Sequence, residues 1–238
     1  MSDNQLFCIL QKENYSLKFH APFRNSIQEE GLGHYFDYLP NGQYYRQTLP
    51  GSISMDIGWN FSSRKNDFFG RWKNLDQDAR TMARANQKLI GLIKLAVDPS
   101  GLRMPQFVYG HFLITHEPHL YDSVGMLHTE LLDTDPMKTY TTQIKYANLV
   151  IDDLVTYILR HNKKNTIIIV MGDHGFRRLP KELNDFRFPN LMAIYFPDTH
   201  YGRLYPNMSP VNLFRIVLNQ YFDQHLPLLK DSSILVNQ

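Results

Sequence analysis

Residues 166–171 read TIIIVM, a run in which every position is apolar or β-branched. A strand with one face in solvent alternates apolar and polar residues, whereas a strand buried on both faces is apolar throughout. Strands of the second kind lie at the centre of parallel sheets that helices cover on both faces. This run therefore predicts a central strand, and it limits the chain to folds that can cover such a strand.

A long amphipathic helix is predicted just before this strand, over residues 138–162. Its apolar positions recur at helical spacing, and the basic stretch RHNKKN at its C-terminal end complements the helix dipole. The apolar stripe consists of Ile144, Ala147, Ile151, Leu154, Val155 and Ile158. A second amphipathic helix is predicted over residues 75–97.

Further strands and helices follow from the same patterns. Strands are predicted at YSLKF, 106–115 and 191–196, and helices at NQLFCILQKEN and after Ser209, with Ser209 as N-cap and Pro210 in the first turn. Their order predicts an α/β fold: one domain over 1–238, with a mainly parallel sheet flanked by helices on both faces. The strands 106–115, 166–171 and 191–196 are expected to pair. Residues 24–72, rich in Gly, Pro and aromatic side chains, are expected to form ordered loops or short helices.

The composition indicates an ordered globular chain and excludes several function classes. Of the 238 residues, 43% are hydrophobic and 20% are charged, and the net charge of +2 gives no argument for nucleic acid or an anionic membrane. No run of apolar residues is long enough to span a membrane, so this chain is expected to be soluble. Cys8 is the only cysteine, which excludes an intrachain disulfide.

Polar residues suited to metal binding follow two of the predicted strands. Gly-Asp-His-Gly, with Asp173 and His174, ends the strand 166–171, and His116 and His119 follow the strand 106–115. Ligands of open α/β sheets bind at the carboxyl ends of the strands, and carboxylate and imidazole groups bind divalent metals. A second interpretation remains open: the glycines form a turn, Asp173 caps it, and the histidines are ordinary surface residues.

Three segments in this order resemble the alkaline phosphatase superfamily. They are His116 to Pro118, the Gln-x-x-Tyr-x-Asn pattern over 143–148, and Gly172 to Gly175. The nearest branch is that of the sulfatase-like and phosphoglycerol-transferase-like proteins of bacterial envelopes. The resemblance is strongest over residues 105–235 and implies an alkaline-phosphatase-like sandwich.

The resemblance also implies roles for individual residues. Asp173 and His174 would bind a catalytic divalent metal (Mn, Zn, Mg or Ca), and His116 would contact the transferred phosphoryl or sulfuryl group. His119 and Arg177 would also bind substrate, since guanidinium matches phosphate and sulfate oxygens. The implied function is that of a hydrolase or transferase acting on a phosphate or sulfate ester of an envelope lipid or glycan. The implied location is the extracytoplasmic face of a bacterial membrane, for a membrane-anchored parent protein.

The nucleophile of this superfamily has no counterpart in the sequence. A sulfatase nucleophile stands two residues before a Pro, but Leu10 occupies that place after Cys8. The chain is therefore expected to be the C-terminal part of a larger enzyme, inactive by itself, with the missing N-terminal part as its partner. Only His116 or His200 could add a third metal ligand, so tight metal binding is not expected.

Two other classes of protein are alternatives to a sulfatase-like enzyme. A non-catalytic binding or scaffold module could have kept the fold and lost the nucleophile. A nucleotide-binding protein is disfavoured, because no Gly-rich phosphate loop follows any predicted strand.

Overall fold

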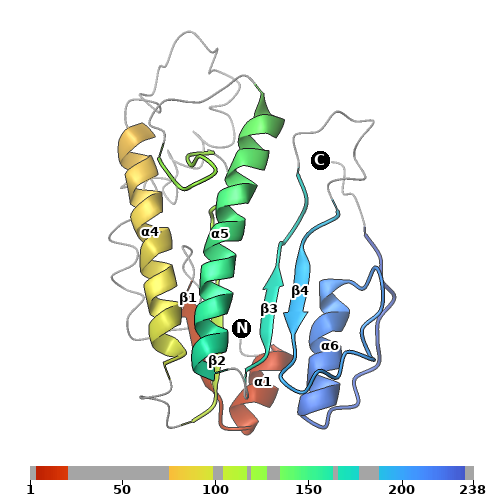
Figure 1. Cartoon of the computed structure of the whole chain (residues 1–238). Helices are drawn as coiled ribbons and strands as arrows, with labels where there is room; N and C mark the ends of the chain where they lie inside the picture. The colour runs from red at the N-terminus through yellow and green to blue at the C-terminus, as the bar shows by residue number, and fades with distance from the viewer. Residues whose placement is uncertain are drawn as a thin grey trace, which may run out of the picture. The chain divides into compact units, whose positions relative to one another are not determined.

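The structure is a computed structural model of the chain (Figure 1). It describes residues 4–20, 75–98, 104–116, 119–127, 135–162, 166–176 and 188–233. The chain divides into two compact units, which are described separately. The first comprises Met1–Leu17, Val97–Phe107 and Val155–Gln238, and the second comprises Lys18–Ala96 and Val108–Leu154. The loops expected over 24–72 and the predicted site residue Arg177 lie outside the described residues.

The first unit begins with helix α1, Gln5–Lys12, as predicted. The side chain of Asn4 caps this helix by accepting a hydrogen bond from the backbone N–H of Leu6 at 3.0 Å. The helix buries Ile9 and Leu10, and the chain turns at Asn14, whose φ is +59°. Asparagine tolerates this left-handed conformation better than most residues, which explains why the helix ends there.

Strands β3, Ile168–Met171, and β4, Met192–Tyr195, form a two-stranded sheet in the first unit. They run antiparallel, with Ile168 opposite Tyr195 and Met171 opposite Met192. Both strands and their pairing with each other were predicted and are confirmed, but the pair is antiparallel, whereas a mainly parallel sheet was expected. An all-apolar run indicates that a strand is buried, but it does not fix the direction of the strand that pairs with it.

Helix α6, Pro210–Tyr221, packs on this sheet (Figure 1). Its apolar face forms a core with the strand residues, in which Phe196 and Leu213 are fully buried. The predicted N-cap position of Ser209 is confirmed, but its hydroxyl makes no capping hydrogen bond. Instead, the backbone N–H of Ser209 donates to the carboxylate of Asp231 at 2.7 Å.

Strands β1, Ser16–His20, and β2, Gln106–Gly110, form the second two-stranded sheet. The N–H of Ser16 donates to the carbonyl of Pro105, and the N–H of His111 donates to that of His20. The residue numbers of the bonded partners increase in the same direction along both strands, so this pair is parallel. The strand predicted over 106–115 is too long. It ends at Gly110, and a turn follows in which the N–H of His116 donates to the carbonyl of Leu113.

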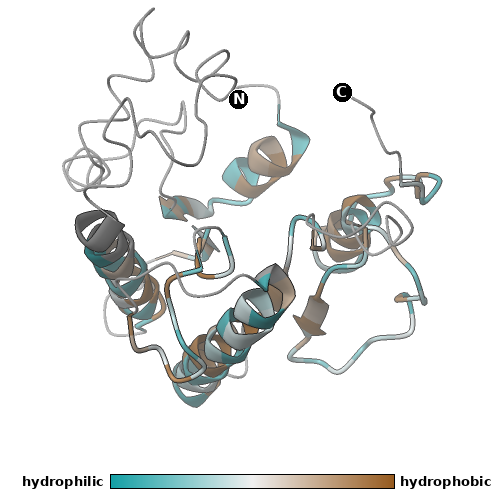
Figure 2. Ribbon diagram, turned by 90° about the horizontal axis from the view of Figure 1, so that it is seen from above, coloured by the Kyte–Doolittle hydropathy of each residue, from teal (hydrophilic) through white to brown (hydrophobic). Residues whose placement is uncertain are grey.

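The second unit holds helix α4, Leu75–Ala96, and the first two thirds of helix α5, Pro136–Asn162. Both helices were predicted, and the helix ribbons in Figure 2 carry hydrophobic and hydrophilic residues together, as amphipathic helices do. Leu89 on α4 and Ala147 on α5 are buried in two small cores of this unit. Among the residues that the structure describes, no helix combines the length and apolar character needed to cross a membrane.

The described elements thus mix helices with two short sheets, one parallel and one antiparallel. The three strands that were expected to pair are distributed over both sheets, so the single mainly parallel sheet is not found in the described residues. The prediction of one domain over 1–238, as an alkaline-phosphatase-like sandwich with helices on both faces, stays a prediction.

Candidate functional site

Gly172 follows β3 and is held through both of its backbone polar groups. Its N–H donates to the carbonyl of Leu191 at 2.9 Å, and its carbonyl accepts from the Nδ2 group of Asn190 at 2.8 Å. A Cβ atom at position 172 would lie 3.3 Å from the Cβ of Asn190, so the absence of a side chain permits this close approach. The peptide that leads into Asp173 is therefore fixed between the end of β3 and the start of β4.

The orientation of the His174 ring is set by the next residue. Its Nδ1 atom lies 2.6 Å from the carbonyl oxygen of Gly175. A carbonyl can only accept, so Nδ1 carries the proton and the neutral ring has its lone pair on Nε2. That Nε2 atom lies 3.6 Å from Oδ2 of Asp173, and the two side chains are 34% and 74% exposed, respectively.

The distance between these two atoms fits a pair of metal ligands. At 3.6 Å, Nε2 and the carboxylate oxygen are too far apart for a hydrogen bond between them. Two ligands of one tetrahedral ion, each bound at ~2.0–2.2 Å, lie roughly 3.3–3.6 Å apart. Within the described parts of the chain, no group of three or more His, Cys, Asp or Glu side chains gathers around a possible metal position. Asp173 and His174 are thus the two donors that can be assigned.

If Asp173 were instead a turn cap, its carboxylate would have different hydrogen-bond partners. A cap would accept hydrogen bonds from nearby backbone N–H groups. In the described residues, the recorded partner of the Asp173 carboxylate is the His174 ring, and the carboxylate is largely exposed. This arrangement favours the ligand interpretation over the cap, while the role of each residue stays a prediction.

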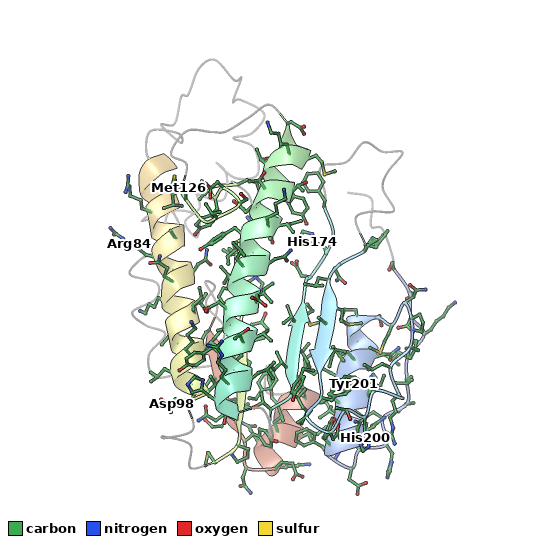
Figure 3. All side chains as sticks on the ribbon, in the orientation of Figure 1. Arg84, Asp98, Met126, His174, His200 and Tyr201 are labelled. Atoms are coloured by element: carbon green, nitrogen blue, oxygen red, sulfur yellow. The ribbon has the colours of Figure 1, made fainter. Side chains whose placement is uncertain are left out.

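His200 is wrong as a third ligand. It follows β4, which runs antiparallel to β3, so it lies beyond the pair Ile168 and Tyr195 at the end opposite Gly172. Figure 3 shows His174 and His200 near opposite ends of this strand pair. The Nδ1 atom of His200 is 3.2 Å from Oδ2 of Asp198, which gives it a separate carboxylate partner.

The remaining predicted residues lie in the loop after β2, in the second unit. His116 is exposed, and its carbonyl accepts from Nε2 of Gln143 at 3.4 Å. His119 is half-buried, with Nδ1 hydrogen-bonded to the Thr139 hydroxyl at 3.0 Å and its ring 5.7 Å from that of Tyr140. The structure thus brings Asp173 and His174 together in one unit and holds His116 and His119 in one loop of the other.

Two amide side chains that bond the backbone of these loops were not predicted from the sequence. Asn190 lies two residues before β4, and an Asn that follows Phe-Pro is a sequence signal for a turn. Gln143 belongs to the Gln-x-x-Tyr-x-Asn pattern, but only its spacing was noted. Tyr146 of the same pattern packs on Tyr121, with ring centroids 4.7 Å apart, and burial raises the pKa of Tyr121.

The described residues combine helices with short strands, and a carboxylate–imidazole pair follows β3. The model of the Sulfatase family matches residues 2–218, which is most of the chain, and the chain belongs to this family. The predicted resemblance is confirmed, and the match extends it from 105–235 over the first hundred residues. Searches of curated proteins and of solved structures found no match.

Proposed function

We propose that this chain carries the metal-binding part of a sulfatase-family hydrolase or transferase that acts on phosphate or sulfate esters. The observation that carries the proposal is the geometry at the end of β3, where Nε2 of His174 and Oδ2 of Asp173 lie 3.6 Å apart. Family membership supports the reaction type, and the exposure of both side chains supports access for an ion and a substrate. The ion would be Mn, Zn, Mg or Ca.

Each residue has a defined task in this proposal. A bound divalent ion would supply Lewis-acid stabilisation to an ester oxygen. Asp173 contributes a carboxylate ligand and its negative charge, and the Gly175 carbonyl keeps Nε2 of His174 directed at the same position. His116 would contact the transferred group, with His119 and Arg177 as further substrate contacts. The attacking group would come from outside the residues assigned here.

The substrate and location are the parts of the proposal that rest on resemblance. Similarity to phosphoglycerol-transferase-like proteins suggests an envelope lipid or glycan, acted on at the extracytoplasmic face of a bacterial membrane by a membrane-anchored parent protein. With two assigned protein donors, this chain alone is expected to bind metal more weakly than micromolar. It is also expected not to turn over nitrophenyl phosphate or nitrophenyl sulfate.

A manganese titration followed by NMR tests the metal site even if binding is weak. Mn²⁺ should first broaden the amide signals of Gly172 to Gly175, and Asp173→Ala should abolish this effect. Asp198→Ala is the matched control, because Asp198 forms another carboxylate–histidine pair in the described part of this unit, and it should change nothing at Gly172 to Gly175.

Four results would count against the proposal. Broadening centred on Asp198 and His200, or broadening at Gly172 to Gly175 that survives Asp173→Ala, would remove the metal site. Calorimetric Mn²⁺ or Zn²⁺ binding at micromolar or tighter affinity would contradict the two-donor description. A chain that shows no response to Mn²⁺ at Gly172 to Gly175 would instead fit a non-catalytic binding or scaffold module.

A further inference from the structure

One buried amide holds the loop that carries His116 and His119. The side chain of Gln143, on α5, is 1% exposed. Its Oε1 atom accepts from the backbone N–H groups of Leu120 at 2.6 Å and Tyr121 at 2.9 Å. Its Nε2 group donates to the carbonyl of His116 at 3.4 Å. A single side chain therefore binds the backbone on both sides of His119.

The need to fill the hydrophobic core does not explain why position 143 is a glutamine. Ala147, one helical turn further along α5, packs against Leu120 and Tyr121 and already supplies apolar contact to the same loop. An apolar residue at 143 would add to that contact but leave two buried N–H groups without an acceptor, which costs more than a hydrogen bond gains. The main effect of the Gln143 amide is therefore to fix the backbone conformation of the loop, and not to bury apolar surface.

A second bond ties the same loop to the same helix. The ring of His119 bonds Thr139, which lies one turn before Gln143 on α5. Hydrogen bonds to α5 thus hold both the side chain of His119 and the backbone that follows it. The backbone at His116 is held to the same helix by the Gln143 amide.

We infer that Gln143 is a positioning residue for anion recognition: it fixes His116 and His119 on α5 without touching the anion itself. This inference rests on the proposed function, because that proposal gives the two histidines their contact with a phosphate or sulfate group. It goes beyond the proposal in assigning the placement of both histidines to one amide on α5.

The inference is tested by NMR on the whole chain, with inorganic phosphate and inorganic sulfate as probes. The variant Gln143→Met has nearly the same volume but no hydrogen-bonding group. It should speed hydrogen exchange at Leu120 and Tyr121 and shift the ring proton resonances of His116 and His119. It should also weaken anion binding at these rings about tenfold, as expected from the loss of one hydrogen bond. Asn148→Ala, on an exposed position of the same helix, is the matched control and should leave all three readouts unchanged.

A conservative variant separates positioning from folding. Gln143→Glu keeps the two acceptor bonds to Leu120 and Tyr121, so it should restore their slow exchange even if Gln143→Met fails to fold. A wild-type anion response that both variants leave unchanged would overturn the positioning role alone. Absence of any phosphate or sulfate response at His116 and His119 in the wild-type chain would overturn the proposed function, and the positioning role with it.

Discussion

At the scale of single residues, Asp173 is presented to solvent while the glycine before it is held firmly. Gly172 bonds Asn190 and Leu191, but the Asp173 carboxylate faces only the His174 ring among the described residues. Fold stability in this region therefore depends on the backbone of Gly172 and not on the two side chains that follow it. This separation leaves the charged groups available for a ligand.

The first prediction is that Asp173→Ala and His174→Ala are nearly neutral for folding, each within about 0.5 kcal/mol of wild type. Both side chains are partly or largely exposed, and neither caps a backbone N–H in the described residues. Urea unfolding of the chain measures the effect. Asn190→Ala provides the contrast, since it leaves the Gly172 carbonyl without its donor and should cost about 1–2 kcal/mol. Losses above about 2 kcal/mol for Asp173→Ala, the upper end for a cap, would reject its role as a ligand.

The second prediction concerns two glycines with opposite environments. Gly125 has φ +90°, and a Cβ there would lie 2.3 Å from a ring carbon of Tyr146. Gly125→Ala should therefore cost about 2–3 kcal/mol, from backbone strain and overpacking together. Gly91 lies within α4 with open space around it, so Gly91→Ala should stabilise the chain by about 0.5–1 kcal/mol. Thermal unfolding of both variants should show shifts in opposite directions, and equal shifts would contradict the geometry at Gly125.

At the scale of elements, α6 binds the extended segment that follows it. The side-chain amide of Asn212 bonds both the N–H and the carbonyl of Leu229, and that of Asn219 bonds both groups of Leu226. Arg215 donates to the carbonyl of Pro227 between them. These three side chains lie on one face of the helix, so the segment runs back along α6, and helix side chains bond the backbone of Leu226, Pro227 and Leu229.

The third prediction follows from the burial of Asn212. This side chain is fully buried, and its Nδ2 group also contacts Tyr205 and Asp231. Asn212→Ala should cost about 2–3 kcal/mol, because it leaves buried groups of Leu229 unpaired. Asn212→Asp should cost at least as much, since it loses the donors and places a second carboxylate beside Asp231. Chemical unfolding measures both, and Asn219→Ala, at a less buried position, should cost less than Asn212→Ala.

At the scale of the whole molecule, local patterns predicted the elements well and their pairing poorly. The periodicity of residues 138–162 gave α5 to within two residues, and the apolar run at 166–171 gave β3. The direction of β4 could not be read from its residues, because side-chain alternation is the same in parallel and antiparallel strands. That error also placed His200 at the wrong end of β3.

The residues of the candidate site also fall into those that local sequence patterns predicted and those that they did not. Asp173 and His174 were predicted because their chemical types follow a strand directly, and neighbours in sequence are necessarily close in space. Gln143 and Asn190 were not predicted as functional, because their importance depends on backbone groups far away in the sequence. Such contacts, between Gln143 and Tyr121 for example, appear only when the fold is known.

The pH dependence of unfolding stability depends on two groups outside the candidate site, Asp231 and Tyr221. Hydrogen bonds from Ser209 and Tyr205 lower the pKa of Asp231 to about 2. Burial, followed by the hydrogen bond to Asp198, raises the pKa of Tyr221 to about 12. In an unfolded chain these groups titrate near ~3.9 and ~10, respectively. The two shifts therefore act on stability at opposite ends of the pH scale.

The last prediction is that unfolding stability depends less on pH, at the acid end and at the alkaline end, when these groups are replaced. The contribution of Asp231 is present above about pH 4 and is lost as the pH falls from about 4 to 2, because its folded-state pKa is lowered. The contribution of Tyr221 is present below about pH 10 and is lost between about 10 and 12, because its folded-state pKa is raised. Urea unfolding across the pH range should show the difference between wild type and Asp231→Asn shrinking in the acid window. The difference between wild type and Tyr221→Phe should shrink in the alkaline window. A difference that stays constant through either window would show that the corresponding hydrogen bonds do not hold α6 and its following segment in solution.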